Sequence, residues 1–360
     1  MRPCGRPDCA LIVGCLVSYA GGAVNRRRLG RTGLMVSEVG FGGAGLGHAW
    51  GETTDAACIR AVRLGLDLGI DFFDTSPVYG GGKSEENLGI GLEGQRDKIV
   101  LATKARLQSD EELDDMATSI RRSVEASLRR LRTDYIDILQ IHHQVGAARG
   151  RYLAVADPPK YALRLPSADA LAFAESTRSL IDEGKVRFIG ITAWDGEPKT
   201  VRGLLESGAF DTAQILYNMV NQSSAAPPPP GFDDIDQSEA LAVARTNDVG
   251  AIGIRSHAAG ALVDRLDRSV KPDSDVARDH ARAAALACFR KAPFTTLSQI
   301  ALRFCLDNPA ISTIVPGFKN SAEVEEAVAC AALPSLSEID IAELQELYRR
   351  QFRQQDRKNL

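Results

Sequence analysis

Short apolar runs and longer helical patterns alternate along the chain from Asn25 onward. The short runs are rich in β-branched residues and predict eight strands, at residues 39–42, 70–75, 99–104, 136–142, 186–191, 212–217, 250–255 and 312–317. The longer stretches carry apolar residues at helical spacing and predict helices at residues 53–68, 112–131, 168–183, 237–246, 295–306, 321–331 and 337–352. The segment RRRLGRTGLMVSEVG (26–40) opens with a predicted hairpin that turns at Thr32–Gly33.

The strand pattern also predicts how the sheet is built. Near-continuous apolar strands are typical of parallel pairing with both faces covered. Eight strand-then-helix units favour a closed barrel over an open doubly wound sheet. We therefore expect an α/β protein with a single (β/α)8 TIM barrel over residues 25–355, an N-terminal β-hairpin cap and an extra C-terminal helix. Two long connections, at residues 144–166 and 258–292, are expected to be loops that cover substrate.

The first 24 residues predict an extension ahead of the folded domain. Arg2 and Arg6 precede an apolar run at residues 10–23, which has the outline of a signal peptide, and Ile12–Cys15 resembles a lipoprotein cleavage box. Asp8 interrupts the positive region, and the run is too short to span a bilayer. We expect an upstream extension or a misassigned start on a cytoplasmic protein, with export or lipid anchoring as the alternative.

Composition and charge narrow the classes of function. The formal net charge is −4 and no basic run with interleaved aromatics stands out, which disfavours nucleic-acid binding. The seven cysteines are an odd number without a C-x-x-C pair, which argues against a disulfide framework and a structural zinc site. We expect no metal, no nucleic-acid partner and no membrane span, while the oligomeric state is not predicted.

A glycine-rich segment, GFGGAG (Gly40–Gly45), matches the dinucleotide-binding pattern G-x-G-x-x-G after a predicted strand. That pattern requires a helix that starts at the glycines, so that its N-terminus meets a pyrophosphate. Here the chain runs on to a helix cap at Thr53 or Thr54, and the acidic residue that would hold a ribose is missing. The glycines instead predict close passage of the backbone at the barrel mouth.

A second segment, GGGKS (Gly80–Ser84), resembles the end of a phosphate-binding P-loop. The first glycine of that motif would fall at Pro77, and the strand before it ends in Asp74 instead of entering the loop directly. We therefore do not expect a nucleotide phosphate at this segment.

Polar side chains with related chemistry follow three consecutive predicted strands. Asp74 ends the second strand, Lys104 the third and His142 the fourth, and Tyr79 lies in the loop after Asp74. The C-terminal ends of the strands in a β/α barrel meet at one mouth, where active sites are built. Each residue alone has an ordinary structural explanation, but their places on adjacent strands predict a shared catalytic site.

This set of residues fits proton transfer to a carbonyl oxygen. An ammonium close to a phenol stabilises the phenolate, and a carboxylate holds the ammonium charged. An imidazole donates to the substrate carbonyl or orients it. None of these groups supplies a hydride, so a cofactor must do so.

A metal-dependent hydrolase or isomerase built on Asp74, His142 and His143 is an alternative. Adjacent residues of a strand face opposite sides, which places the two imidazoles apart. We expect His143 to be the exposed partner of His142.

Six segments together resemble the aldo-keto reductase superfamily, and the resemblance covers the chain from Arg26 to about Leu333. They are LGRTGLMVSEVGFGG (29–43), GIDFFDTSPVYGGGKSEENLG (69–89), VLATK (100–104), LRTDYIDILQIH (131–142), KVRFIGIT (185–192) and IVPGFKNSAEVEEA (314–327). FFDTSPVYG and RFIGIT are similar to the aldose dehydrogenases that act on sugars. The resemblance implies a nicotinamide-dependent oxidoreductase whose catalytic residues are Asp74, Tyr79, Lys104 and His142, with Tyr79 as general acid in reduction and general base in oxidation.

The resemblance also implies a coenzyme site. Thr192 and Ala193 lie where family members hold the nicotinamide carboxamide, and Gln214 matches a third partner of that amide. The stretch RSHAAGAL (255–262) matches the loop across the pyrophosphate, which here offers Arg255, Ser256, His257 and Leu262. The segment that holds the adenosine end matches Gly317, Lys319, Asn320, Glu323 and Glu326.

Three of these positions depart from the family pattern. Ala193 replaces an asparagine, so one hydrogen bond to the carboxamide is lost or supplied differently. Arg255 stands where many members have a tyrosine stacked on the nicotinamide, and a guanidinium can also stack. Glu323 stands where an arginine often clamps the 2′-phosphate, whereas Lys319 favours that phosphate. We expect NADP(H), with NAD(H) as the alternative.

The substrate is expected to be a small carbonyl compound or alcohol of the sugar, aryl aldehyde or alkyl aldehyde class. It should lie under the loop that contains His48 and Trp50, near Tyr79, and Trp194 is expected to reach the same pocket. Packing at the barrel rim explains either tryptophan equally well. The alternative function is a cofactor-binding barrel that acts as a sensor or regulatory subunit.

Overall fold

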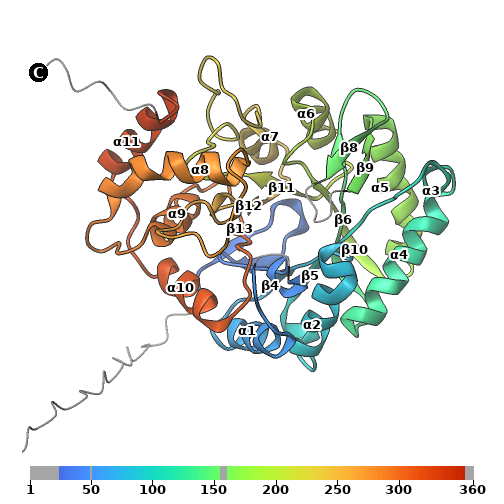
Figure 1. The fold of residues 1–360 in the computed structure, drawn as a ribbon. Helices are drawn as coiled ribbons and strands as arrows, with labels where there is room; N and C mark the ends of the chain where they lie inside the picture. The colour runs from blue at the N-terminus through green and yellow to red at the C-terminus, as the bar shows by residue number, and fades with distance from the viewer. Residues whose placement is uncertain (1–23, 49–50, 155–159, 353–360) are drawn as a thin grey trace, which may run out of the picture.

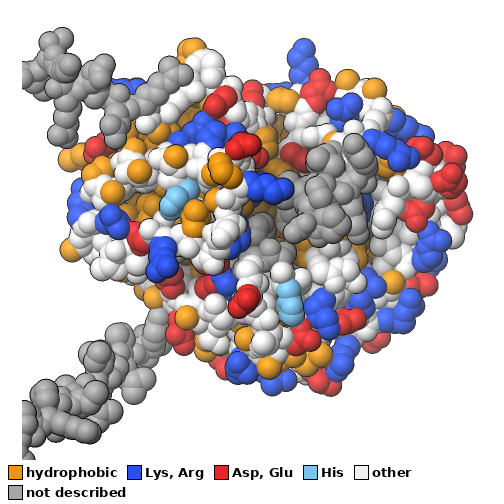
Figure 2. Space-filling model, viewed as in Figure 1, with side chains coloured by type: hydrophobic (Ala, Val, Ile, Leu, Met, Phe, Trp, Pro, Cys, Tyr) orange, Lys and Arg blue, Asp and Glu red, His pale blue; other side chains and the backbone are white. Residues whose placement is uncertain are grey.

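A computed structural model describes residues 24–48, 51–154 and 160–352. The predicted extension therefore lies outside the described residues except for Val24, whose side chain is buried in the core. The described chain forms a parallel barrel surrounded by helices, with a hairpin before it and a helix after the last unit (Figure 1). The predicted fold class is confirmed. On the face seen in Figure 2, acidic and basic side chains are interspersed around the rim.

Eight parallel strands form the main sheet, in the order β13, β12, β11, β10, β6, β5, β4, β3. Their bounds are β3 (Phe41–Gly42), β4 (Phe72–Asp74), β5 (Val100–Ala105), β6 (Ile136–Ile141), β10 (Val186–Thr192), β11 (Thr212–Leu216), β12 (Gly250–Ile254) and β13 (Thr313–Ile314). Parallel bridges from Val39 to Ile314 and from Gly42 to Gly317 join the first strand to the last and close the barrel.

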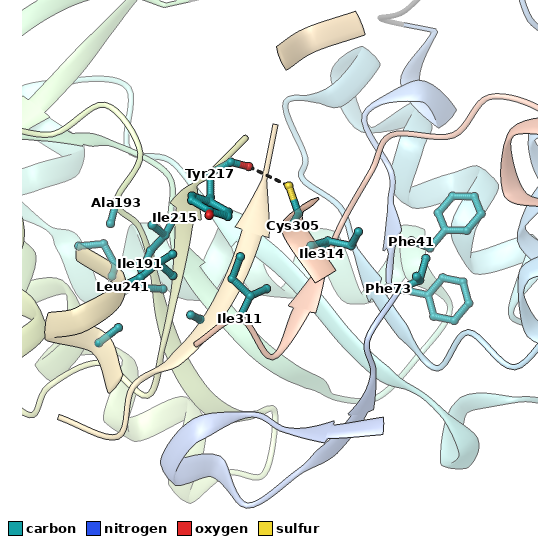
Figure 3. Packing of buried hydrophobic residues seen from close by; sticks show 14 of the residues in the cluster. Phe41, Phe73, Ile191, Ala193, Ile215, Tyr217, Leu241, Cys305, Ile311 and Ile314 are labelled. Atoms are coloured by element: carbon teal, nitrogen blue, oxygen red, sulfur yellow. Dashed lines mark hydrogen bonds between the residues drawn. The ribbon is translucent and has the colours of Figure 1, made fainter. Parts of the chain in front are cut away.

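Alternate residues of each strand face two different cores. A small cluster inside the barrel includes Phe72, Val100, Ala102, Ile138 and Ile252. A large cluster between strands and helices includes their sequence neighbours Phe73, Leu101, Leu139 and Ala251. Figure 3 shows the part of the large cluster around Phe73 and Ile314. The near-continuous apolar strands of the sequence thus result from burial on both faces.

The same alternation determines where the polar residues at the strand ends face. Side chains two residues apart in a strand share a face. Asp74 follows Phe72 at this spacing and Lys104 follows Ala102, so both face the barrel interior at its C-terminal mouth.

A two-stranded hairpin covers the opposite end of the barrel, as predicted. Strands β1 (Arg26–Arg28) and β2 (Met35–Ser37) pair antiparallel, with the short helix η1 (Gly30–Thr32) and Gly33 in the turn. Leu29 and Val36 are fully buried in the barrel cluster. Gly30 fits because a Cβ there would lie 2.1 Å from the backbone nitrogen of Gly250.

Seven helices in the described chain correspond to predicted ones and lie in the outer ring (Figure 1). They are α1 (Asp55–Asp67), α4 (Met116–Leu131), α5 (Ser167–Asp182), α7 (Ala240–Thr246), α9 (Leu297–Leu306), α10 (Ser321–Ala331) and α11 (Glu338–Arg349). The predicted cap before α1 is Thr54, whose hydroxyl accepts a hydrogen bond from the backbone nitrogen of Ala57. The helix predicted from residue 112 is split at Asp115, because α3 (Asp110–Asp114) precedes α4.

Other helices of the described chain were not predicted. These are α2 (Lys83–Gly91), α6 (Pro198–Glu206) and α8 (Asp275–Ala283), and α8 lies inside a connection that was expected to be a loop. Each is only nine residues long. In so short a segment the apolar residues do not repeat often enough to show a helical period.

A second sheet follows β6, where a loop was predicted. Strands β7 (Gln144–Val145), β8 (Gly150–Ala154) and β9 (Lys160–Leu165) form it, with β9 in the middle. Leu163 and Leu165 are buried and alternate with the more exposed Arg164, which is the pattern of a strand with one covered face. The prediction of a loop was wrong, because the alternation in β9 spans only a few residues of a long connection.

The glycines of GFGGAG permit close backbone contacts, as expected. A Cβ on Gly42 would lie 2.6 Å from the carbonyl oxygen of Pro316, and one on Gly45 would lie 2.3 Å from that of Phe318. Both contacts join the first barrel strand to the chain after β13. These glycines therefore help to close the barrel.

The described cysteines Cys58, Cys288, Cys305 and Cys330 are free thiols. Within the described ranges, every helix is too short or too polar to cross a bilayer.

Candidate active site

A buried ion pair joins two neighbouring strands at the barrel mouth. Lys104 Nζ donates to Asp74 Oδ2 over 2.6 Å and to the carbonyl oxygen of Thr75 over 2.8 Å. Burial lowers the pKa of Lys104, but the charges of Asp74 and Tyr79 together outweigh it and raise the pKa above its usual value. The ammonium therefore stays charged at neutral pH.

Two glutamines complete the hydrogen bonding of Asp74. The Nε2 atoms of Gln140 and Gln214 each donate to Asp74 Oδ1 over 2.8 Å. Gly190 makes room for Gln140, because a Cβ at Gly190 would lie 2.8 Å from Gln140 Cγ. The carboxylate thus accepts from three side chains, and each of them comes from a different strand.

Tyr79 lies beside this ion pair. Lys104 Nζ is 4.9 Å from the centre of the Tyr79 ring, and the phenol remains partly exposed. Its backbone is held by contact between η3 (Tyr79–Gly82) and η2 (Gly45–Gly47). A Cβ on Gly47 would lie 2.6 Å from the carbonyl carbon of Tyr79, so the absence of a side chain at Gly47 allows this approach.

His142 meets Tyr79 edge to face. Their ring centres are 6.0 Å apart at an interplanar angle of 85°. His142 Nδ1 lies 3.1 Å from the hydroxyl of Ser76. Burial first, and then the charges of Arg106 and Lys104, lower the pKa of His142 well below 6.5. The imidazole is therefore neutral at physiological pH, and the four predicted catalytic side chains lie together at one mouth.

His143 lies on the other side of its strand, as the alternation requires. It is only 1% exposed, so the expectation of an exposed His143 was wrong. Its Nε2 accepts from the backbone nitrogen of Leu107 over 2.9 Å, and its Nδ1 donates to the carbonyl oxygen of Leu163 over 2.9 Å. Burial lowers its pKa to about 4. One ring nitrogen bonds to the chain after β5 and the other to β9 of the second sheet, so both are engaged within the protein.

The residues expected at the nicotinamide carboxamide lie next to the catalytic group. The Thr192 hydroxyl donates to the carbonyl oxygen of Ile141 over 2.8 Å, and Gln214 donates to Asp74 as described above. Ala193 is buried in the large outer cluster, where its methyl group packs against apolar side chains (Figure 3). Thr192 and Gln214 therefore each donate one hydrogen bond to another residue of the protein.

The segment after β12 carries backbone strain. Arg255, Ala258 and Ala259 have positive φ angles of 58°, 46° and 56°, which non-glycine residues rarely adopt. Such strain clusters at ligand sites, where the surrounding structure holds it. The predicted loop residues Ser256 and Leu262 are buried, and His257 Nε2 lies 3.0 Å from the hydroxyl of Ser298.

Lys319 is held between two carboxylates. Its Nζ lies 2.7 Å from Asp267 Oδ2 and 2.5 Å from Glu323 Oε1. Glu323 Oε2 also accepts from the backbone nitrogen of Lys319, and Asn320 caps α10 by accepting from the backbone nitrogen of Glu323. Asp267 was not predicted, because it lies in an irregular connection far from Lys319 in sequence.

The two remaining residues expected at the adenosine end lie on either side of this group. Glu326 accepts from the Thr296 hydroxyl over 2.8 Å. Gly317 forms the bridge to Gly42 that closes the barrel.

The structure describes two of the three predicted substrate residues, and their surroundings differ. His48 is exposed, and its Nε2 lies 3.0 Å from Asp55 Oδ1 at the start of α1. Trp50 lies outside the described residues. Trp194 is half-buried, and the guanidinium of Arg255 lies 5.1 Å from its ring centre.

Three residues of the site were not singled out from the sequence. Gln140, Ser76 and Arg106 contact Asp74 or His142 directly. A signal was present for two of them, because Gln140 lies two residues before His142 and Arg106 lies two residues after Lys104. Residues at that spacing share a strand face.

The chain is similar in sequence to known proteins. The family model described as the aldo/keto reductase family matches residues 38–349. L-galactose dehydrogenase from Arabidopsis thaliana is 31% identical over 309 residues, which cover 85% of this chain and 88% of that protein.

Solved structures share the fold. An aldo-keto reductase from Bacillus halodurans in its holo form superposes with a TM-score of 0.67 at 23% identity, covering 90% of this chain and 96% of the other. An aldo-keto reductase from Klebsiella pneumoniae in complex with NADPH gives a TM-score of 0.62 at 22% identity, covering 91% and 96%.

Proposed function

The chain belongs to the aldo/keto reductase family, and on that premise we propose that it transfers a hydride between NAD(P)(H) and a small carbonyl or alcohol substrate, with Tyr79 as the acid–base residue. The observation that carries the proposal is the buried pair of Asp74 and Lys104, with Lys104 Nζ 4.9 Å from the centre of the Tyr79 ring. An oriented ammonium beside a phenol lets that phenol give up and regain a proton near neutral pH.

Lys104 acts through its fixed charge. Its hydrogen bonds to Asp74 and Thr75 hold the ammonium at one position, and burial keeps water from screening it. In reduction, Tyr79 donates its hydroxyl proton to the substrate oxygen, and the remaining phenolate is stabilised by Lys104. In oxidation, the same phenolate accepts the proton of the alcohol.

His142 orients the substrate carbonyl. The Ser76 hydroxyl already accepts from the backbone nitrogen of Val78, so its own hydrogen is available to His142 Nδ1. Nε2 then carries the remaining ring hydrogen and donates it toward the substrate oxygen. A neutral imidazole suits this role, because it donates a hydrogen bond without adding a second positive charge beside Lys104.

The residues at the mouth fit a nicotinamide coenzyme, which supplies or accepts the hydride when it is bound. The strained segment at residues 255–259 offers backbone close to the mouth, as a ligand-holding loop does. Gln214 bonds to Asp74, and Thr192 pairs with Gln214 between neighbouring strands, where a carboxamide partner is needed; Lys319 offers a cation for the adenosine end.

NADP(H) is the coenzyme that we propose first. Lys319 can pair with a 2′-phosphate, and the Klebsiella pneumoniae relative contains NADPH. Asp267 and Glu323 both hold Lys319 already, so the phosphate must displace at least one carboxylate. This competition makes NAD(H) the second coenzyme to test.

The substrate class that we propose is a sugar or a related aldehyde. The similarity to a protein named L-galactose dehydrogenase supports a hydroxylated substrate. His48, Trp50 and Trp194 stay predictions as substrate residues.

The test is an assay of coenzyme oxidation and reduction. Turnover is monitored by the near-ultraviolet absorbance of the reduced nicotinamide. Both coenzymes are assayed against aldoses, aryl aldehydes and their alcohols. Wild-type protein should turn over at least one such pair, and Tyr79→Phe should lose about 10²- to 10⁴-fold in kcat while its coenzyme affinity stays within about twofold. Wild-type turnover by Tyr79→Phe would show that another group transfers the proton. A protein that binds coenzyme without turnover would instead be a sensor or regulatory subunit.

A further inference from the structure

Two charged side chains near the catalytic mouth, Arg106 and Asp195, form no close ion pair with any described residue. Arg106 donates only through Nε, to the carbonyl oxygen of His142 over 2.8 Å, and its two terminal amino groups form no hydrogen bond or ion pair with any described residue. The carboxylate of Asp195 likewise forms none with another described side chain. The mechanism proposed above uses neither of them.

The strand register places Arg106 next to the reacting groups. Ala105 pairs with Ile141, and Ile141 pairs with Ile191, so the next residue of each strand, Arg106, His142 and Thr192, lies at the same level of the mouth. Arg106 also shares a strand face with Lys104, two residues earlier. Its free amino groups therefore belong to the catalytic side of the barrel.

Asp195 lies on the same side, three residues past Thr192. Its carbonyl oxygen accepts from Gln144 Nε2 over 2.8 Å, and the backbone nitrogen of Gln144 donates to the hydroxyl of Tyr152 over 3.4 Å. Burial raises the pKa of Asp195 to about 6, while the charges of Arg106 and Arg255 lower it. Arg106 and Asp195 also both act on the pKa of Tyr152, so the three groups lie close enough to interact.

The half-buried Asp195 carboxylate accepts from its own backbone nitrogen and from no other described donor, which leaves most of its acceptor capacity open. Buried polar groups nearly always have a hydrogen-bond partner. A buried group without one has lost its hydrogen bonds to water and gained none in return, which raises the free energy of the folded state. Most charged side chains on this barrel are paired with an opposite charge, including Lys104, Lys319 and Arg282. Unpaired donors and a carboxylate with open acceptor capacity at a catalytic mouth point to partners that arrive with a ligand.

We propose that Arg106 and Asp195 form a recognition pair for the hydroxyl groups of a polyhydroxylated substrate, an aldose or its sugar alcohol. The proposal rests on the proposed function and names the substrate class of that site. A hydroxyl group both donates and accepts, so neighbouring hydroxyls can donate to the Asp195 carboxylate and accept from the Arg106 amino groups. An aldehyde of the same length without hydroxyl groups can form hydrogen bonds only through its carbonyl oxygen.

The test compares two substrates that share a carbon chain. D-threose carries hydroxyls, and butanal has the same chain without them. Asp195→Asn should lower kcat/KM for D-threose by about 10- to 100-fold, the loss expected when a hydrogen bond to a charged group is weakened. The loss should lie mainly in KM, because the bond is present in both ground state and transition state. For butanal, kcat/KM should stay within about twofold.

Matched variants separate recognition from structure. Asp182→Asn removes an exposed carboxylate from the last residue of α5, at the other end of the barrel, and should leave both substrates unchanged. Arg106→Met should also act more strongly on D-threose than on butanal. Equal losses on both substrates for Asp195→Asn would show a merely structural role and overturn the proposal.

Two further outcomes bear on the substrate class. A wild-type preference for a uronate over the aldose, lost in Arg106→Met but kept in Asp195→Asn, would identify a carboxylate site and overturn the hydroxyl assignment. Failure of the wild type to turn over these two aldehydes and every compound of the panel described above, with either coenzyme, would refute the proposed function. Turnover of both aldehydes with a ratio unchanged in Asp195→Asn would refute the recognition pair alone.

Discussion

Lys104 Nζ lies 2.6 Å from Asp74 Oδ2, and the two side chains are only 0% and 6% exposed. This ion pair connects the fold to the proposed chemistry, because it sets both the position of Lys104 and the charge beside Tyr79. Removing one partner of a buried pair leaves the other charge without compensation, which is more harmful than removing both.

Lys104→Met should therefore lower the free energy of unfolding by roughly 3–5 kcal/mol. The double variant with Asp74→Asn should lose less than the sum of the two single losses, because it leaves no buried charge unpaired. Urea unfolding of the wild type, the two single variants and the double variant gives the four free energies of a double-mutant cycle. Additive losses would mean that the two side chains do not stabilise each other.

His142 should remain neutral throughout the working pH range. Burial and the nearby charges of Arg106 and Lys104 hold its pKa well below 6.5, so the neutral imidazole should predominate at neutral pH. An NMR titration of the ring, with His142→Asn to assign the signal, measures this directly. A midpoint near 6.5 for that signal would contradict the burial argument.

Asp195→Asn should stabilise the protein at neutral pH. The pKa of Asp195 is about 6 in the folded protein, above its usual 3.8, so ionisation is harder in the folded state than in the unfolded state. Wild-type stability therefore falls as pH rises from about 4 through 6, whereas the amide variant has no such fall.

The gain at neutral pH should be roughly 1–3 kcal/mol and should vanish near pH 4. The attraction of Arg106 and Arg255 to the carboxylate is lost in the amide variant, but it is already included in the raised pKa, in which burial outweighs it. Thermal unfolding at the two pH values measures the gain. A variant that is less stable than wild type at neutral pH would show that the interactions of the ionised carboxylate outweigh its burial.

Glu323→Gln should shift coenzyme preference toward NADP(H). Lys319 now faces two carboxylates, Asp267 and Glu323, and removing one charge leaves more of the ammonium for a 2′-phosphate. The ratio of affinities for NADPH and NADH should rise by about 3- to 10-fold, the size of one partly exposed charge interaction. Glu338→Gln, on the exposed first turn of α11, is the control and should leave the ratio unchanged. An unchanged ratio in Glu323→Gln would place the phosphate elsewhere.

Gly47→Ala should impair turnover although Gly47 contributes no side chain. The new Cβ would lie 2.6 Å from the carbonyl carbon of Tyr79, so the backbone of Tyr79 must shift. A shift of about 1 Å at a catalytic group can lower kcat about 100-fold. Gly203→Ala is the matched control, because a Cβ there meets nothing within 4 Å and Gly203 lies in α6. Equal activity of both variants with wild type would show that the turn at Tyr79 tolerates displacement.

Sequence alone was enough for the barrel and for the group of catalytic candidates. The strands are apolar on both faces, and this is a local property that a sequence displays directly. Asp74, Lys104 and His142 follow such strands, and parallel strands bring their C-terminal ends to one mouth whatever the detailed packing. The glycines at 42 and 45 were also interpretable, since only close backbone contact explains them.

Tertiary structure decided what each polar group contacts. Gln140 and Gln214 converge on Asp74 from distant strands, Asp267 meets Lys319 across the fold, and Asp195 lies near Arg106. The second sheet and the nine-residue helices likewise depend on packing against the barrel, which the local sequence pattern does not show. The physical reason is separation along the chain. Apolar periodicity is a property of neighbouring residues, whereas a hydrogen bond between residues far apart in sequence forms only in the folded barrel.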